Sequence, residues 1–358
     1  MSHTEFKIYK IFFPIAWMYG VGVWIRNYLF DKGILKSKSF LIPVLSVGNL
    51  TVGGTGKTPH TEYLIRLLKD EFSVAVLSRG YKRKSKGFLL SDSHTTMNQV
   101  GDEPFQMKKK YPSVRIAVDK DRCHGIEQLA MANLKPATEV IILDDSYQHR
   151  YVKPGLNILL VDYNRLITRD ALLPVGRLRE PVSEKRRANI IIITKCPEEM
   201  KPVEFRLLTR ELEVYPYQDL FFSTFRYGKM FKLFGQGILP LEKLVGDEQI
   251  LLLTGIASPK PMIKKIKKYN RHIYPLTFAD HHNFTDKDIQ EINNRFKSLS
   301  GDKRLVITTE KDASRLLSMM GLLDEVRAVI YVLPIEVIFL RKQETIFNEK
   351  IRDYVRKN

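Results

Sequence analysis

The segment from Thr51 to Thr58 carries the residue types that point most directly to a chemistry. It reads Thr-Val-Gly-Gly-Thr-Gly-Lys-Thr and lies between the strand pattern at Val44 to Val47 and a helical pattern. Glycines let backbone amides curl around phosphate oxygens, Lys57 would neutralise the β and γ phosphates, and the Thr58 hydroxyl would bind Mg²⁺. The segment therefore resembles a P-loop, although the general motif has glycine where this chain has Thr51. The predicted nucleotide-binding residues are Thr51, Val52, Gly53, Gly54, Thr55, Gly56, Lys57 and Thr58.

A P-loop alone does not identify a reaction, because switches, motors, synthetases and kinases share it. A guanine-binding Asn-Lys-x-Asp motif would follow a late strand, and residues 194–197 instead read Thr-Lys-Cys-Pro after the run Ile190 to Ile193. The aspartate is missing, so GTP is disfavoured. Membrane ATPases that position the division septum carry an additional lysine just before the paired glycines. This chain has Val52 there, so that class is also disfavoured.

Acidic residues follow a second apolar strand pattern. Asp144 and Asp145 come directly after Val140 to Leu143, which is the arrangement of a Walker B element, where a carboxylate holds Mg²⁺ directly or through water. The same pair could instead form a turn or cap a helix. Two other candidates have similar alternatives, since Asp102 could cap a helix and His281 could lie in a surface loop. Local sequence does not decide between these alternatives.

The elements that must position these residues alternate along the chain after Pro43. A short β-branched run repeatedly precedes a helical pattern, which is typical of parallel strands joined by crossover helices. An α/β fold is therefore expected, with a parallel sheet flanked by helices, because strands buried on both faces form unbroken apolar runs. The strands expected in the first domain are Val44 to Val47, Val74 to Leu77, Val114 to Val118, Val140 to Leu143, Ile158 to Val161 and Ile190 to Thr194.

A second alternating set predicts a smaller α/β domain. Between Pro202 and Leu244 the pattern loosens into short aromatic pieces, so the domain joint is placed there. The expected division is an amino-terminal helix at 1–30, a P-loop domain at 31–220, the smaller domain at 221–341, and a helix at 342–358 that could pack back on the first domain. The second set comprises strands at Ile250 to Thr254, Ile273 to Leu276, Leu305 to Thr308 and Val329 to Val332, and helices at about 259–268 and 285–299.

The run from Ile11 to Ile25 has no charged residue and contains both tryptophans of the chain, Trp17 and Trp24. It is shorter than the about 20 apolar residues of a bilayer span. It also lacks the small residues of a signal-peptide cleavage site, because Arg-Asn-Tyr follows it at 26–28. One interpretation is a helix in the membrane interface, with its aromatic rings at headgroup depth and flanking basic residues near anionic lipid. The alternative is a helix buried in the core of the protein.

Composition limits the class of protein. The chain has 358 residues, of which 44% are hydrophobic and 27% charged, so two globular domains are expected and disorder is excluded. Its net charge of +18 favours anionic partners, which include nucleic acid, acidic lipid and phosphorylated small molecules. Cys123 and Cys196 lie far apart, so neither a disulfide framework nor a thiolate zinc site is supported, and a reducing cytosol fits best.

Taken together, the motifs resemble those of the tetraacyldisaccharide 4'-kinases of the lipid A pathway, in order and spacing over nearly the whole chain. That family also has threonine at the first P-loop position, and it begins with an apolar membrane-associating helix. Tyr147 stands where many members have phenylalanine. The motifs that carry the resemblance are residues 47–59, Ser78-Arg79-Gly80-Tyr81, Gly101-Asp102-Glu103-Pro104, Asp144-Asp145-x-x-Gln148-His149, residues 176–181, Asp280-His281 and Thr309-Glu310-Lys311-Asp312-Ala313.

The resemblance implies a reaction and roles for individual residues. ATP, with Mg²⁺, would donate its γ-phosphoryl group to the 4'-hydroxyl of a tetraacylated glucosamine disaccharide 1-phosphate, which gives lipid IVA. Asp102 would take the hydroxyl proton and His281, rather than its neighbour His282, would orient and tune it. Lys57 completes the catalytic set. The metal-binding candidates are Thr58, Asp144 and Asp145, and the further family positions near nucleotide or acceptor are Arg122, Gln148, His149, Arg179 and Glu180.

The expected partners are the membrane-held acylated glucosamine disaccharide phosphate and anionic inner-leaflet lipid, with no nucleic acid. The chain is expected to be a monomer that attaches peripherally to the cytoplasmic face of the inner membrane. A membrane-associated P-loop ATPase that is not a kinase remains the alternative, and the fate of the γ-phosphate of ATP would distinguish the two.

Overall fold

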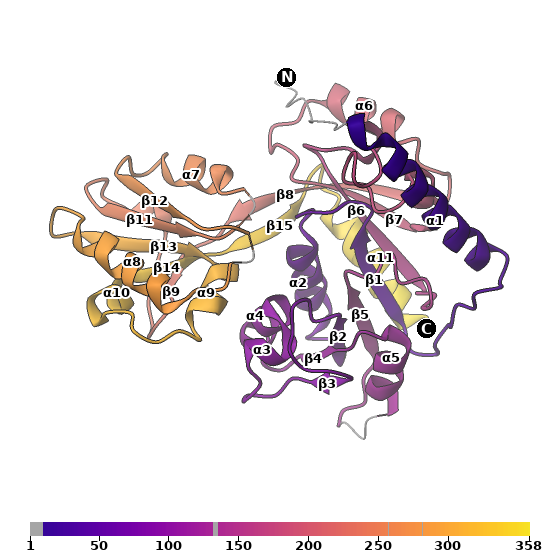
Figure 1. Ribbon diagram of the computed structural model, residues 1–358, viewed down its shortest axis with the longest axis horizontal. Helices are drawn as coiled ribbons and strands as arrows, with labels where there is room; N and C mark the ends of the chain where they lie inside the picture. Colours follow the sequence, from indigo (N-terminus) through magenta and orange to yellow (C-terminus); the bar gives the residue numbers. More distant parts are fainter. Residues whose placement is uncertain (1–9, 132–134, 257, 281) are drawn as a thin grey trace.

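Two β-sheets form two lobes of the molecule (Figure 1). The computed structural model describes residues 10–131, 135–256, 258–280 and 282–358. A nine-stranded sheet forms the large lobe and a six-stranded sheet forms the small lobe. The strands of the large sheet, in spatial order, are β15 (Ile335–Phe339), β8 (Asp219–Tyr227), β7 (Ile190–Thr194), β6 (Leu156–Asp162), β1 (Val44–Asn49), β5 (Val140–Asp144), β2 (Val74–Ser78), β4 (Arg115–Val118) and β3 (Leu89–Leu90).

The interior of the large sheet is parallel, and only its edge strands β15 and β3 pair in the antiparallel sense. Every residue of β1, β2, β5 and β7 is buried. Because successive side chains of a strand point to opposite faces, such runs need cover on both sides of the sheet. The expected parallel sheet is confirmed, and each of the six strands predicted for the first domain is present.

Helices cover both faces of the large sheet. On one face, Leu45 and Ile142 share a core with Ile65, Met107 and Phe347, which lie on three different helices. The alternate strand residues face two further cores on the opposite side. The helices of the first face are α2 (Lys57–Leu68), α4 (Asp102–Lys110) and α11 (Glu344–Arg356), and those of the opposite face are α5 (Arg122–Met131) and α6 (Pro202–Leu212).

The small lobe repeats the layered arrangement on a smaller scale. Leu251 and Leu253 of β11 (Gln249–Thr254), the second strand from one edge of the sheet, face a core with α8, α9 and α10, whereas Ile250 and Leu252 face α7 on the other side. The strands are, in spatial order, β10 (Ile238–Leu239), β9 (Met230–Lys232), β14 (Ile330–Leu333), β13 (Arg304–Thr309), β11 (Gln249–Thr254) and β12 (Ile273–Thr277), and the helices are α7 (Lys260–Ile266), α8 (Asp286–Lys297), α9 (Glu310–Leu316) and α10 (Asp324–Val329).

The antiparallel pair β8 and β15 joins the lobes, with Ile335 opposite Tyr227 and Phe339 opposite Ser223. The lobes also touch where α4 packs against α9. The domain boundary predicted between residues 220 and 221 falls inside β8. The aromatic segment expected to form the joint is itself a strand, and its Phe221 and Phe222 are buried. The sequence pattern does not predict β8 or β15.

A long helix, α1 (Phe13–Asp31), lies on the outside of the large lobe (Figure 1). It buries Ala16, Asn27 and Phe30 against the protein, while Trp17 is 72% exposed and Trp24 is 61% exposed. Among the described residues, no helix is both long and apolar enough to cross a membrane. The remaining short helices are α3 (Met97–Val100) and four 3₁₀ helices at Lys10–Phe12, Ile167–Arg169, Val182–Arg187 and Leu241–Lys243.

Candidate active site

The glycine-rich loop and the acid pair lie together at one edge of the large sheet. Strands β1 and β5 are parallel neighbours in which Val47 lies opposite Asp144, so both end at the same edge. The loop at 50–56 follows β1 and leads into α2, which begins at Lys57. In open α/β sheets, ligands bind outside the carboxyl ends of the strands. The sheet topology thus brings the predicted nucleotide-binding residues and Asp144 and Asp145 to a position suited to a ligand.

Polar contacts from neighbouring strands hold the loop. The Asn49 side-chain amide donates to Oγ1 of Thr55 at 2.9 Å, and the Thr194 hydroxyl donates to the carbonyl oxygen of Thr55 at 2.8 Å. The Lys195 ammonium group donates to the carbonyl oxygen of Gly54. Backbone amides in a loop fixed in this way keep a constant direction, which is the requirement for a preorganised anion site.

Gly56 joins the loop to α2 in a conformation that favours glycine. Its φ is 91° and its ψ is 29°, in the left-handed region. A Cβ atom at this position would lie 2.6 Å from Cζ of Phe225. No side chain caps the amino terminus of α2, so the first amides of the helix remain available to an anion near Lys57.

Two basic side chains converge on Asp145. The Lys57 Nζ atom lies 3.5 Å from Oδ1 of Asp145, and Nη1 of Arg179 lies 3.4 Å from the same oxygen. Asp145 itself has a φ of 49°, which is uncommon outside glycine and asparagine or aspartate. The Asp145 carboxylate and the cations of Lys57 and Arg179 therefore lie together next to the loop, where they could balance the charge of a bound phosphate.

Asp144 is the buried member of the acid pair. Thr61 Oγ1 donates to its Oδ1 at 3.1 Å, while its Oδ2 is buried without a hydrogen-bond partner among the described residues. Burial above all, together with the Glu103 and Asp145 carboxylates and against the effect of Lys57, raises the pKa of Asp144 to about 7. A buried carboxylate oxygen with no partner, beside a second carboxylate, fits a site for a divalent cation.

The donor set limits the kind of metal site that could form. Within the described part of the chain, no group of three or more His, Cys, Asp or Glu side chains is arranged to hold a metal ion. A closed protein cage is therefore not available from those residues. Mg²⁺ does not need one, since it is commonly bound by one or two carboxylates together with phosphate and water oxygens. Asp144, Asp145 and the hydroxyl of Thr58, next to Lys57 in α2, would suit this mode.

Arg122 lies beside the acid pair, and His149 lies close to Arg122. The Arg122 guanidinium is buried and donates to the carbonyl oxygen of Asp144 at 3.3 Å. Burial, partly offset by Asp144 and Asp145, lowers the pKa of Arg122 to about 10. Burial, followed by the repulsion from Arg122, lowers the pKa of His149 to about 4, and its Nε2 is buried without a partner in the described chain. His149 is therefore a neutral imidazole near the site at neutral pH.

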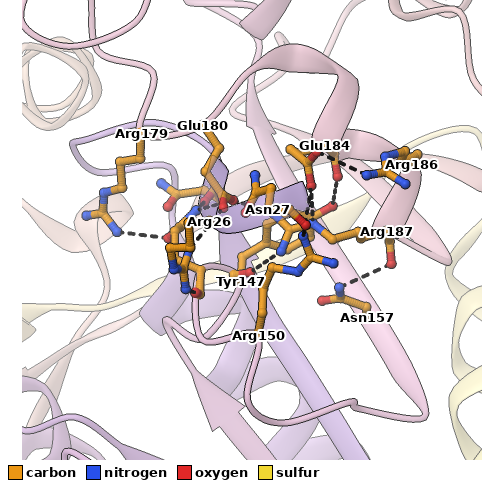
Figure 2. Close-up of polar contacts among 12 residues, drawn as sticks. Arg26, Asn27, Tyr147, Arg150, Asn157, Arg179, Glu180, Glu184, Arg186 and Arg187 are labelled. Atoms are coloured by element: carbon orange, nitrogen blue, oxygen red, sulfur yellow. Dashed lines mark hydrogen bonds and ion pairs between the residues drawn. The ribbon is translucent and has the colours of Figure 1, made fainter. Parts of the chain in front are cut away.

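Glu180 belongs to a polar network that includes Arg26 of α1 (Figure 2), and Gln148 contacts Glu180. Gln148 Nε2 donates to the carbonyl oxygen of Asn49 at 2.8 Å and to Oε2 of Glu180 at 3.3 Å. Glu180 is buried and also pairs with Arg187 and, at 3.5 Å, with Arg26 of α1. Gln148 thus holds the end of β1 from which the loop starts, and Glu180 contacts Gln148 and links it to α1.

Asp102 lies at the interface between the lobes, at the start of α4. Its Oδ2 accepts from Nη2 of Arg315 in α9 at 2.6 Å, and its Oδ1 accepts from the backbone amide of Glu103 at 3.0 Å. Because Glu103 raises the pKa of Asp144, this end of α4 faces the acid pair. His281, the residue predicted to pair with Asp102, lies outside the described residues.

Several residues of the site were not singled out from the sequence. Arg315 lies two positions after a recognised motif, but its helix reads Glu-Lys-Asp-Ala-Ser-Arg-Leu, so no apolar pattern in the sequence marks this arginine as buried. Asn49 and Thr61 gave no signal, because a polar residue next to a glycine-rich loop is common and only the fold shows that these two contact Thr55 and Asp144.

A family model for tetraacyldisaccharide-1-P 4'-kinase matches residues 8–356 of the chain. The chain belongs to this kinase family. Two curated relatives are named tetraacyldisaccharide 4'-kinase. The one from Phocaeicola vulgatus is 57% identical over 100% of this chain and 98% of its own length. The one from Porphyromonas gingivalis W83 is 44% identical over 96% of this chain and 97% of its own length.

A crystal structure of a member of this kinase family resembles the present fold. LpxK from Aquifex aeolicus, crystallised in complex with ATP, is 31% identical, has a TM-score of 0.73, and matches 96% of this chain and 98% of its own. The likeness thus extends over both lobes of the kinase. Enzyme class and membership in the lipid A pathway, which the sequence motifs predicted, are confirmed by these comparisons.

Proposed function

We propose that this kinase transfers the γ-phosphoryl group of ATP to the 4'-hydroxyl of tetraacyldisaccharide 1-phosphate, which gives lipid IVA. The observation that carries the proposal is the meeting of the glycine-rich loop, Lys57 and the acid pair Asp144 and Asp145 at one edge of the sheet. Membership of the family supplies the acceptor, and the ATP complex of the Aquifex aeolicus relative supports the donor.

In the proposal, residues 51–58 form a P-loop that binds the triphosphate. The loop amides and the open amino terminus of α2 would accept phosphate oxygens, and Lys57 would release Asp145 to contact the β and γ phosphates. A bound Mg²⁺, held by Thr58 with Asp144 or Asp145, would supply neutralising charge to the phosphates. Nucleotide binding is thus assigned to backbone and side chains already fixed by Asn49 and Thr194.

For the transfer step, Asp102 is assigned as the base. It takes the proton of the 4'-hydroxyl, the hydroxyl oxygen bonds to the γ-phosphorus, the bond from that phosphorus to the β–γ bridging oxygen breaks, and ADP leaves. Lys57, Arg122 and Arg179 offset the negative charge around the transferring group. His281 is given the role of orienting Asp102 on the family pattern alone.

The acceptor is an acylated lipid, so the reaction must take place at a membrane surface. Helix α1 supports this requirement, because Trp17, Met18 and Trp24 are 72%, 69% and 61% exposed, respectively. Exposed aromatic and aliphatic side chains on a helix next to basic residues favour an interfacial position on anionic lipid. The proposal therefore places the kinase peripherally on the cytoplasmic face of the inner membrane, as a monomer.

The test follows the radioactive γ-phosphate of ATP. The purified kinase is incubated with γ-³²P ATP, Mg²⁺ and tetraacyldisaccharide 1-phosphate in mixed micelles, and the label is separated by chloroform extraction. Label in a chloroform-soluble disaccharide lipid, absent with Lys57→Met, is the expected result. Label in free phosphate alone would contradict the proposal and favour an ATPase of another function.

A further inference from the structure

We propose that Arg315 is a positioning residue for the reaction, in which its guanidinium group, held rigidly in the small lobe, fixes the carboxylate of Asp102 across the interface between the lobes. The inference rests on the proposed function, since it takes Asp102 as the base of that reaction. It adds a residue from α9 whose contribution is made through Asp102 and not through substrate.

The contact between the two side chains is close and buried. Nη2 of Arg315 lies 2.6 Å from Oδ2 of Asp102, and the two side chains are 1% and 13% exposed. The other Asp102 oxygen accepts from the backbone amide of Glu103 at 3.0 Å. Since each carboxylate oxygen has a defined donor, both the position and the plane of the Asp102 carboxylate are restrained.

The guanidinium group is itself held from behind. Nη1 of Arg315 donates to Oδ1 of Asp312 at 3.0 Å and to the carbonyl oxygen of Gly255 at 3.3 Å. Asp312, which is fully buried, accepts in turn from the hydroxyl of Thr309 at 2.7 Å and from the backbone amide of Gly255 at 2.9 Å. The ends of β11 and β13 thus fix Asp312, Asp312 fixes Arg315, and Arg315 fixes Asp102.

Burial of the charged groups in this network costs desolvation free energy, and a purely structural role does not explain that cost well. Burying an arginine is expensive unless its charge is compensated, and buried ion pairs rarely stabilise a fold more than apolar side chains of similar volume would. Here Arg315 pairs with two carboxylates, Asp312 of its own lobe and Asp102 of the other lobe. The arrangement instead suits catalysis, because the base reaches its working position only when α4 and α9 are in contact.

Other charged groups near Asp102 also affect the pH at which its carboxylate ionises. Glu103 is its neighbour on α4, and on α9 the ammonium of Lys311 lies 3.7 Å from Glu103 and 3.8 Å from Asp280, which follows β12. Asp312 faces the pair from within α9. Of these groups, Arg315 lies at hydrogen-bond distance of Asp102, so its removal has a direct effect on that carboxylate.

The test compares Arg315→Met with Arg315→Lys in the full-length kinase, by the micellar assay, equilibrium binding of ATP, and thermal melting. The expected result for Arg315→Met is a kcat about 10- to 100-fold lower with ATP affinity within about 3-fold, because a general base contributes about 10²–10⁴-fold and would be misplaced, not removed. Arg315→Lys should retain more activity, because it keeps the charge.

The pH profile of kcat supplies a readout that a merely structural role would not move. A guanidinium group beside a carboxylate favours the ionised form, so its loss should move the acidic limb of the profile upward by about one pH unit or more. Arg304→Met is the matched control. It removes a guanidinium group of the same lobe, which lies 3.4 Å from Glu325 and over the ring of Phe296, away from α4.

A second variant guards against misfolding. Arg315→Met leaves the buried carboxylate of Asp312 uncompensated, so the double variant Arg315→Met/Asp312→Asn removes that charge as well and should fold while showing the same shift of the acidic limb. A folded double variant with wild-type kcat and an unmoved pH profile would overturn the inference. Failure of the wild-type kinase to label lipid would instead overturn the proposed function, so the two failures are distinguishable.

Discussion

Replacing Gly56 by alanine tests the geometry of the loop directly. The residue has a φ of 91°, where a side chain costs about 1–2 kcal/mol. The new Cβ would also lie 2.6 Å from Cζ of Phe225, a ring that packs against the main core of the large lobe. Overpacking of this kind costs about 1–3 kcal/mol. The two effects together predict that the free energy of unfolding falls by about 2–4 kcal/mol.

The assay is thermal melting of the kinase without ligand, followed by circular dichroism. At about 2–4 °C per kcal/mol for a lobe of this size, the expected fall in melting temperature is roughly 5–15 °C. Gly54→Ala is the control within the same loop, because a Cβ there meets nothing within 4 Å, and its melting temperature should stay close to that of the wild type. Equal melting temperatures for Gly56→Ala and Gly54→Ala would refute the reasoning.

Three further predictions concern the acid, the base and the membrane. Asp102→Ala and His281→Ala should each lower kcat at least ~100-fold with little change in ATP affinity, and near-normal turnover in both would remove the proposed dyad. Burial raises the pKa of Asp144 to about 7 from an ordinary 3.8. Between these two pH values the folded chain keeps the Asp144 proton and the unfolded chain loses it, so the free energy of unfolding falls as the pH rises from 3.8 to about 7. Asp144→Asn should therefore raise the melting temperature of the unliganded kinase at pH 8 more than at pH 5, and an equal change at both pH values would count against the shift. The double variant Trp17→Glu/Trp24→Glu should sediment less with anionic vesicles while its melting temperature stays unchanged. Undiminished sedimentation would contradict the prediction that α1 contacts the membrane.

The parallel core of both lobes could be predicted from sequence, because strands buried on both faces are continuous apolar runs such as Ile190–Ile193. The strands β8 and β15 could not. Residues 220–225 lack the β-branched regularity of the other strands. Their conformation depends on pairing with β7 at residues 191–193 and with β15 at residues 337–339, which lie more than a hundred positions away. Long-range pairing of this kind leaves no local pattern.

Within the candidate site, the meeting of the loop with the acid pair could be predicted, because both motifs combine fixed residue types with fixed spacing. Their binding of phosphate and Mg²⁺ stays a prediction. The contact between Arg315 and Asp102 could not be predicted, and the pairing of Asp102 with His281 stays a prediction. Arg315 is separated from Asp102 by 213 residues, and only the packing of α4 against α9 shows that the two meet. Gln148 and Glu180 were found by family pattern, but no motif describes their contacts with Asn49 and Arg26.

The return of α11 to the large lobe has a consequence for biosynthesis. Phe347, Ile351 and Val355 pack in one core with Leu45 and Val47, so that core unites residues from both ends of the chain. The ribosome must therefore release the chain through Val355 before this face of the sheet is fully covered. The small lobe, whose strands and helices lie between Met230 and Leu333, is synthesised earlier, so it can fold before the large lobe acquires α11.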